Sequence, residues 1–206
     1  MELFFAAALA AMAFWTIRSQ EQGRRIALLG RHLGHYQIEK HMEALTQGYL
    51  RALGEDDGER RKQIWLLLGG TERALRGQFT RMAAEFASTD AAQARVSKLP
   101  FYVPFAVRFA PAASFDMRRA LELHARGLGR AMDAGDVSPR DRAFTISAEL
   151  LLMQHTCHWF CRSRMMASAR TLACHKTSYD QLLASVSPQT RAEYLALTAL
   201  SRAGRA

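Results

Sequence analysis

Residues 144–175 decide the fold and read FTISAELLLMQHTCHWFCRSRMMASARTLACH. The chain's three cysteines all lie here, together with three of its seven histidines, and the stretch contains no proline or glycine. Just before it, Ser138-Pro139-Arg140-Asp141 forms a strong helix start. Serine caps free N–H groups, proline suits the first turn and aspartate favours the positive end of the helix dipole. We therefore predict one long central helix over residues 139–175.

This central helix should be buried on several sides. At about 100° per residue, one apolar stripe holds Phe144, Ala148, Leu151, Leu152, His155, Trp159, Met166, Ala169 and Ala173. The opposite face is also apolar as far as Cys161, and a helix that is apolar nearly all round has neighbours on several sides. His155 is then either a neutral core histidine with both nitrogens hydrogen-bonded, or a metal ligand or proton carrier facing a cavity.

The composition is that of a globular chain with a basic surface. Of its 206 residues 49% are hydrophobic and 23% charged, and the net charge is +9. A positive surface can meet nucleic acid, anionic lipid or an acidic protein, or can simply be solvated. No acidic residue occurs between Asp90 and Asp116. Three cysteines cannot all pair within one chain, so free thiols indicate a reducing compartment.

The N-terminal run over residues 3–17, LFFAAALAAMAFWTI, is uncharged. It measures about 22 Å as a helix, short of the roughly 30 Å hydrocarbon core. A membrane anchor, a buried N-terminal helix and a signal sequence remain open, although Glu2 stands where a signal sequence would be basic. Trp15 suits a membrane interface, and the arginines that follow place the N-terminus outside. We predict a single-pass bacterial inner-membrane protein with an anchor over residues 1–18 and a cytoplasmic helical bundle over residues 19–206.

Two further helical segments follow the anchor, over residues 19–53 and 59–88. Ile38, Met42, Leu45, Tyr49 and Ala52 step by four and three, as in a coiled coil, and a five-residue turn over residues 54–58 precedes the second segment. We predict an antiparallel hairpin within residues 19–88 that packs or self-associates. Gly69 and Gly70 indicate a close helix crossing or a kink rather than a phosphate-binding loop, because no Walker lysine or second strand accompanies them.

Residues 89–115 connect the hairpin to the bundle core. A short helix to about Lys98 is predicted first, and Pro100, Pro104 and Pro111 then exclude a regular helix. The dense aromatics of this segment either plug the bundle core or meet a membrane surface or a partner. The residues that we predict to contact the membrane or a partner are Trp15, Arg18, Arg24, Arg25, Phe101, Tyr102, Phe105 and Arg108.

The bundle core is predicted over residues 116–206. A helix to about Asp133 has an inner face of Met117, Leu121, His124, Leu128 and Ala131. The central helix follows, then a short helix to about Val186. A last helix begins at Pro188 and ends near Arg202.

The densest group of metal-ligating residue types is His155, Cys157, His158 and Cys161. One helical turn separates Cys157 from Cys161, a workable spacing for two zinc ligands. A tetrahedral site would need further ligands from other helices, for instance His124, His35 or His41, or a break in the helix before Cys174. No catalytic motif, di-iron pattern or zinc-finger spacing is present.

Three functions are therefore compared. We favour a membrane-anchored scaffold without a cofactor that binds an unknown protein partner, with self-association into a homo-oligomer left open. A zinc-binding or thiol-redox module on the central helix is the alternative. Nucleic-acid binding is the third, but the basic residues are spread over several helices with no recognisable reading head.

Overall fold

The computed structural model describes residues 1–200 of the chain. Residues 201–206, with the predicted helix end near Arg202, lie outside the described residues. Over residues 1–200 the chain forms nine α-helices and one two-stranded ribbon, so the protein is all-α as predicted. The elements are, in chain order, α1 (Glu2–Leu33), α2 (Ile38–Gly54), α3 (Gly58–Phe86), β1 (Arg95–Ser97), α4 (Ala106–Phe109), the 3-10 turn η1 (Pro111–Ala113), β2 (Ser114–Asp116), α5 (Met117–Asp133), α6 (Pro139–Cys161), α7 (Arg164–His175), α8 (Tyr179–Ser185) and α9 (Pro188–Thr198).

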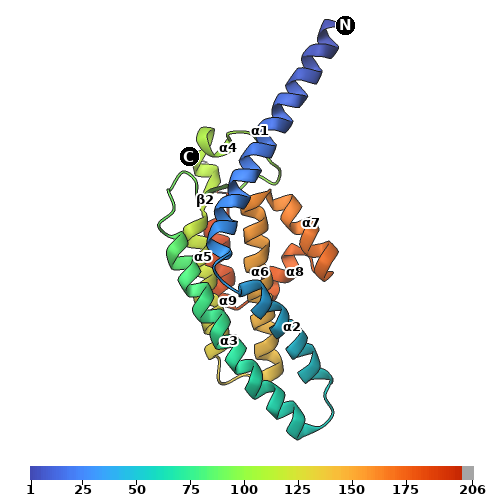
Figure 1. Cartoon of the computed structure of the whole chain (residues 1–206), viewed down its shortest axis with the longest axis vertical. Coiled ribbons are helices and arrows are strands. Elements are labelled where there is room, and N and C mark those ends of the chain that lie inside the picture. The colour runs from blue at the N-terminus through green and yellow to red at the C-terminus, as the bar shows by residue number, and fades with distance from the viewer. Residues whose placement is uncertain (201–206) are drawn as a thin grey trace, which may run out of the picture.

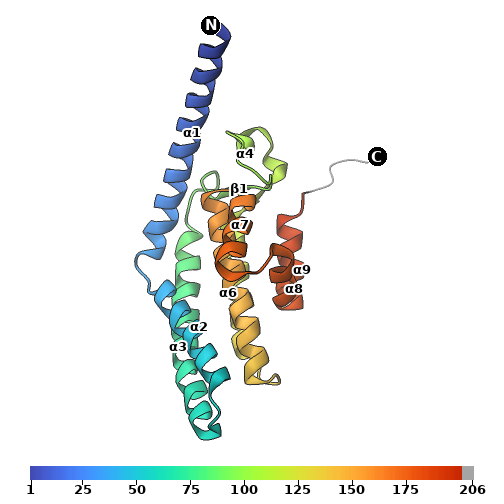
Figure 2. The same ribbon diagram turned by 90° about the vertical axis from the view of Figure 1, so that its right-hand side faces the viewer.

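The elongated molecule has α1 projecting from one end. The C-terminal half of α1 lies along the bundle and its N-terminal half extends past every other described element (Figure 1). A quarter-turn view shows the same projection beside the short helix α4 (Figure 2). The loop of the α2–α3 hairpin lies at the opposite end, so the anchor candidate and the hairpin tip are as far apart as the fold allows.

The hairpin forms with the predicted seam. All five of its predicted α2 residues are buried, which confirms the periodicity. Asp57 caps α3 by accepting hydrogen bonds from the N–H groups of Glu59 and Arg60. The close approach of the two helices is at Gly48, where an added Cβ would lie 2.2 Å from Leu68 Cδ2. The prediction of a close crossing at Gly69 and Gly70 is wrong, because both have room for a Cβ.

The central position of α6 is confirmed, but the predicted helix over residues 139–175 is two helices. Ser138 caps α6 as expected, and α6 packs against α1, α2, α5, α7 and α8. The helix ends at Cys161, and Ser163 begins α7 by accepting a hydrogen bond from the Met166 N–H. The Ser163 cap therefore begins a new helix within a stretch that apolar periodicity alone predicts as one helix. Four residues of the predicted apolar stripe are exposed, namely Phe144, Met166, Ala169 and Ala173.

Two other boundaries differ from the prediction. The predicted helix over residues 19–53 is interrupted after Leu33, where Gln37 N–H donates to the side chain of Gln78 on α3. The predicted short helix before Lys98 is a turn followed by β1. This strand pairs antiparallel with β2, with Val96 opposite Phe115. The ribbon covers the end of α6, since Trp159 donates to the Ser97 carbonyl at 2.9 Å.

Candidate functional site

The N-terminal half of α1 is exposed to solvent throughout. In the part of the chain that the structure describes, α1 alone is long and apolar enough to cross a membrane, and none of its 18-residue apolar window is buried. Trp15 is 68% exposed. The alternative of a buried N-terminal helix is therefore wrong, because nothing in the bundle covers this run.

The proline-rich segment between the strands projects beside α1. The paired strands β1 and β2 hold its two ends together, and the Pro100 carbonyl accepts from the Met165 N–H at the start of α7. Between Pro104 and Pro111 only the single turn α4 forms, as expected where prolines deny helix hydrogen bonds. We call residues 99–113 the aromatic loop.

Most of the large apolar side chains of the aromatic loop face outward. The exposed fractions are 56% for Phe101, 38% for Val103, 48% for Phe105 and 79% for Phe109. The interpretation that these aromatics plug the core is therefore wrong. Apolar side chains that gather on one exposed segment mark a contact with lipid or with another protein.

One residue of the aromatic loop fastens it to α1. The Tyr102 hydroxyl donates to Glu21 Oε2 at 2.6 Å, and the Tyr102 ring packs edge-to-face on Phe14 with centroids 6.0 Å apart. Burial and the Glu21 carboxylate raise the pKa of Tyr102, so its hydroxyl stays a donor at neutral pH. The exposed loop and the exposed run of α1 thus meet at the contact of Tyr102 with Phe14, and we call the two together the apolar end of the molecule.

Arginines from distant parts of the sequence surround this end. Arg24 and Arg108 are exposed, and Arg18 is half-buried. Arg25 has a structural role, since it donates to Glu21 at 2.9 Å and to the Phe160 carbonyl at 3.1 Å. Lys98 does not add to this basic surface, because it is buried and donates to the Ala199 carbonyl.

The structure divides the predicted metal ligands between two sides of α6. His155 is fully buried, where its Nε2 pairs with Ser168 Oγ at 3.0 Å and its ring stacks on Tyr179 at 4.7 Å. Its Nδ1 has no partner among the described residues, so only one of the two hydrogen bonds expected for a core histidine is present.

Cys157, His158 and Cys161 line a groove of about 650 Å³ between α6, α1 and α2. Glu39 lines the same groove, a neighbour that sequence spacing did not indicate. Burial raises the pKa of Cys157 to about 12 and that of Cys161 to about 11. Both thiols are therefore protonated at neutral pH, whereas zinc binds thiolates.

Within residues 1–200 no three histidine, cysteine or acidic side chains are grouped as a metal site requires. The helpers that we predicted have other contacts. His124 pairs with Thr156 Oγ1 at 2.9 Å, and His41 pairs with Gln78 at 3.0 Å. Zinc binding therefore stays a prediction that would need rearranged side chains.

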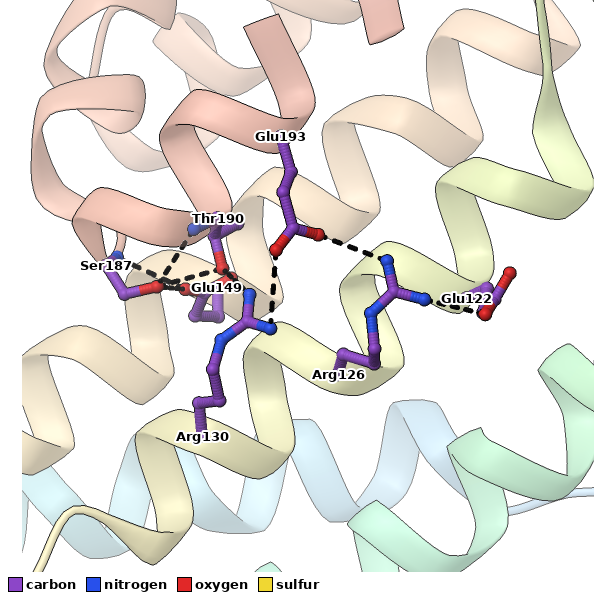
Figure 3. A network of polar contacts seen from close by, with 7 residues as sticks. All are labelled: Glu122, Arg126, Arg130, Glu149, Ser187, Thr190 and Glu193. Atoms are coloured by element: carbon purple, nitrogen blue, oxygen red, sulfur yellow. Dashed lines mark hydrogen bonds and ion pairs between the residues drawn. The ribbon is translucent and has the colours of Figure 1, made fainter. Parts of the chain in front are cut away.

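A polar network joins α5, α6 and α9 on another side of the bundle (Figure 3). Glu149, 1% exposed, accepts from the N–H of Ser187 at 3.2 Å and from its hydroxyl at 3.0 Å. Glu193 lies between Arg126, at 3.1 Å, and Arg130, at 3.6 Å. Arg126 and Arg130 on α5 thus hold α9 through Glu193. This network explains how the last helices dock.

No family model, curated protein or solved structure matches this chain. The function proposed below therefore rests on the geometry of the chain itself.

Proposed function

We propose that this protein is a single-pass bacterial inner-membrane protein whose cytoplasmic helical bundle sits against the membrane and binds a partner protein. The observation that carries the proposal is the apolar end, where an unburied apolar helix and the exposed aromatic loop lie next to each other. Exposing either apolar surface to water is unfavourable in free energy, and burying it in lipid is favourable.

The length of α1 supports a role for the loop in the same membrane. From Phe14 onward α1 lies beside the aromatic loop. Residues 1–13 measure about 20 Å along the helix axis, less than the roughly 30 Å of a hydrocarbon core. A crossing helix of this length needs a thinned bilayer or a bundle that enters the interface. Phe101, Phe105 and Phe109 are suited to the second arrangement, since segments that lie in the interface bury such apolar side chains at the boundary of headgroups and acyl chains.

Arginine positions support the orientation. Arg18, Arg24, Arg25 and Arg31 follow the apolar run, against the single acid Glu21. Basic residues next to a span stay on the cytoplasmic side. The bundle is then cytoplasmic and the N-terminus outside.

The hairpin offers a surface for the partner. Leu50, Leu53, Leu66 and Leu67 are exposed, with Leu66 at 78% and Leu67 at 76%. They lie on the α2–α3 hairpin, toward the end of the molecule opposite the apolar end (Figure 2). These exposed leucines on one hairpin support protein binding, by a partner or by a second copy.

Membrane attachment is tested by fractionation of cells that express the full chain or a version lacking residues 1–18. The full chain should stay in the membrane fraction through an alkaline wash, and the truncated chain should become soluble. Recovery of both in the soluble fraction would reject the proposal.

The depth of the aromatic loop is tested with an environment-sensitive dye on Phe109→Cys, in a background with the exposed Cys174 changed to serine. Leu66→Cys is the matched control, because the two side chains are 79% and 78% exposed. In liposomes a lipid-bound quencher should quench the dye at position 109 and leave position 66 unaffected. Equal quenching at both positions would contradict the proposed orientation.

Partner binding is tested by purification in mild detergent. Proteins that co-purify with the wild type should be lost from Leu66→Ser/Leu67→Ser and retained by Gln63→Ser, an exposed neighbour on the same helix. If the leucine variant retains every partner, the hairpin is not the binding surface.

A further inference from the structure

A basic groove lies directly below the apolar end, between α1 and the aromatic loop. Its volume is about 640 Å³, within the range of ligand sites. Three separate parts of the chain line it, namely the stretch of α1 that follows the anchor, the turn and strand at β1, and α4. The residues that matter to its chemistry are Ile17, Arg24, Arg95, Phe105, Val107 and Arg108.

The charge of this groove is strongly one-sided. Arg24, Arg25, Arg95 and Arg108 line it, and Glu21 is its one acidic lining residue. Glu21 is already engaged, since Arg25 and Tyr102 donate to its two oxygens at 2.9 and 2.6 Å. Across residues 1–200 neither Arg24, Arg95 nor Arg108 forms a salt bridge.

Another arginine-lined groove, between α3 and α5, provides a comparison. There Arg76 pairs with Asp133 at 2.6 Å and Arg118 with Asp116 at 2.7 Å. Arg126 pairs with Glu122 at 2.6 Å. Carboxylates of the protein already neutralise most of that groove. In the groove beside α1, Arg24 and Arg108 form no ion pair within residues 1–200, and Arg95, opposite Asp116 in the ribbon, donates to Ser114 Oγ at 3.5 Å.

The groove beside α1 is apolar on the side of the anchor and basic beyond it. Along α1 its lining changes from Ile17 to Arg24, two turns farther from the anchor, and these positions share one helix face. Phe105 and Val107 of the aromatic loop add apolar surface. An apolar part next to a cluster of guanidinium groups matches a lipid, with acyl carbons near Ile17 and a phosphate near the arginines.

We propose that this groove binds the phosphate headgroup of an anionic phospholipid, held by Arg24, Arg95 and Arg108. The inference rests on the proposed membrane location, because only there does the groove lie at headgroup depth. Free inorganic phosphate shares the headgroup's chemistry but cannot use the apolar side of the groove.

The test uses the purified full chain in neutral detergent, with native mass spectrometry to count bound lipids. Phosphatidylglycerol and phosphatidylcholine with the same acyl chains are compared. The wild type should prefer phosphatidylglycerol, and Arg24→Gln/Arg95→Gln/Arg108→Gln should lose about tenfold in that preference. The matched control is Arg60→Gln/Arg61→Gln/Arg73→Gln, which removes the same charge from exposed positions of α3.

Equal binding of the two lipids to the wild type would overturn the inference, and so would an equal loss in the α3 control. Inorganic phosphate is added as a competitor. If it displaces phosphatidylglycerol at equal concentration, the site is a phosphate site and the lipid assignment is wrong. If the triple variant does not fold, the exposed Arg108→Gln should lower the preference by itself, and an unchanged preference would also overturn the inference.

This outcome is separate from that of the proposed function. A chain that stays in washed membranes without headgroup preference refutes the groove alone. A chain that leaves the membrane refutes the proposed location.

Discussion

The hydroxyl of Tyr102 donates a hydrogen bond to Glu21 Oε2 at 2.6 Å, while Arg25 holds the other oxygen of that carboxylate at 2.9 Å. This contact joins residues 81 positions apart and is the main polar link between the aromatic loop and α1. It sets the loop beside the anchor and engages Glu21 with Arg25 and Tyr102, so that Glu21 does not pair with Arg24, Arg95 or Arg108.

Tyr102→Phe should loosen the aromatic loop without unfolding the bundle. A hydrogen bond to a charged, half-buried partner contributes about 1–2 kcal/mol. Amide exchange over residues 99–110 should therefore become roughly tenfold faster. Hydrogen exchange with mass spectrometry measures this directly. Tyr36→Phe is the control, because Tyr36 donates to Glu85 at another place in the fold and at 2.5 Å. Equal acceleration by both variants would show a general loss of stability instead.

Gly127→Ala should destabilise the docking of α9. The added Cβ would lie 2.5 Å from Thr190 Oγ1 and 2.7 Å from Glu149 Oε2, two atoms of the network in Figure 3. Overpacking of this kind costs about 1–3 kcal/mol in unfolding free energy. Gly70→Ala is the opposite case, since nothing lies within 4 Å of its Cβ and alanine favours a helix interior by about 1 kcal/mol. Denaturant unfolding should shift the two variants in opposite directions, and a shared direction would contradict the packing seen here.

Periodicity predicted correctly the buried faces of those helices that pack through a regular apolar repeat. The seam of α2 and the inner face of α5 are buried residue for residue, and the start of α6 is where Ser138 and Pro139 indicate. Periodicity does not show the break at Ser163, because the break involves a contact with a distant helix. Arg162 follows the end of α6, and its guanidinium donates a hydrogen bond to Gln22 on α1 at 2.8 Å. The strands β1 and β2 have three residues each, too few to show alternation.

The apolar end could be predicted in part. The uncharged run and the proline-aromatic segment are visible in the sequence, and so are the arginines after the anchor. Their proximity is not visible, because Tyr102 and Glu21 meet only once the ribbon has fixed the loop. Arg95 is the residue that sequence reasoning missed. The one available signal was the acid-free run between Asp90 and Asp116, which indicates a basic surface without assigning it to α1.

Acid should weaken the fold through two buried histidines. Burial lowers the pKa of His124 to about 3 and that of His155 to about 4. At pH values between these lowered pKa values and the ordinary histidine pKa of about 6.5, the unfolded chain binds more protons than the folded chain. The unfolding free energy then falls as pH falls, by up to about 1.4 kcal/mol per pH unit for each histidine.

Glu149 acts in the opposite direction, because burial raises its pKa, so the comparison must be between variants. Denaturant unfolding at pH 7 and pH 5 should show a smaller pH dependence in His124→Gln and in His155→Gln than in the wild type. His175→Gln, at an exposed position, should keep the full dependence. An unchanged slope in both buried variants would contradict the assignment.

The three thiols should differ in reactivity, and the difference separates the scaffold from a thiol-redox module. Only the thiolate reacts with an alkylating reagent. With pKa values of about 12 and about 11, Cys157 and Cys161 carry almost no thiolate at pH 7.5, whereas Cys174 is exposed. Cys174 should be labelled at least roughly 100-fold faster in the folded chain, and all three should react alike in denaturant. Mass spectrometry of timed samples gives the rates.

If Cys161 reacted as fast as Cys174, the groove between α6 and α1 would hold a reactive thiol and the redox alternative would regain support. If zinc ions slowed Cys157 and Cys161 together while leaving Cys174 unchanged, the two thiols would share a metal, because binding to one site protects only its own ligands.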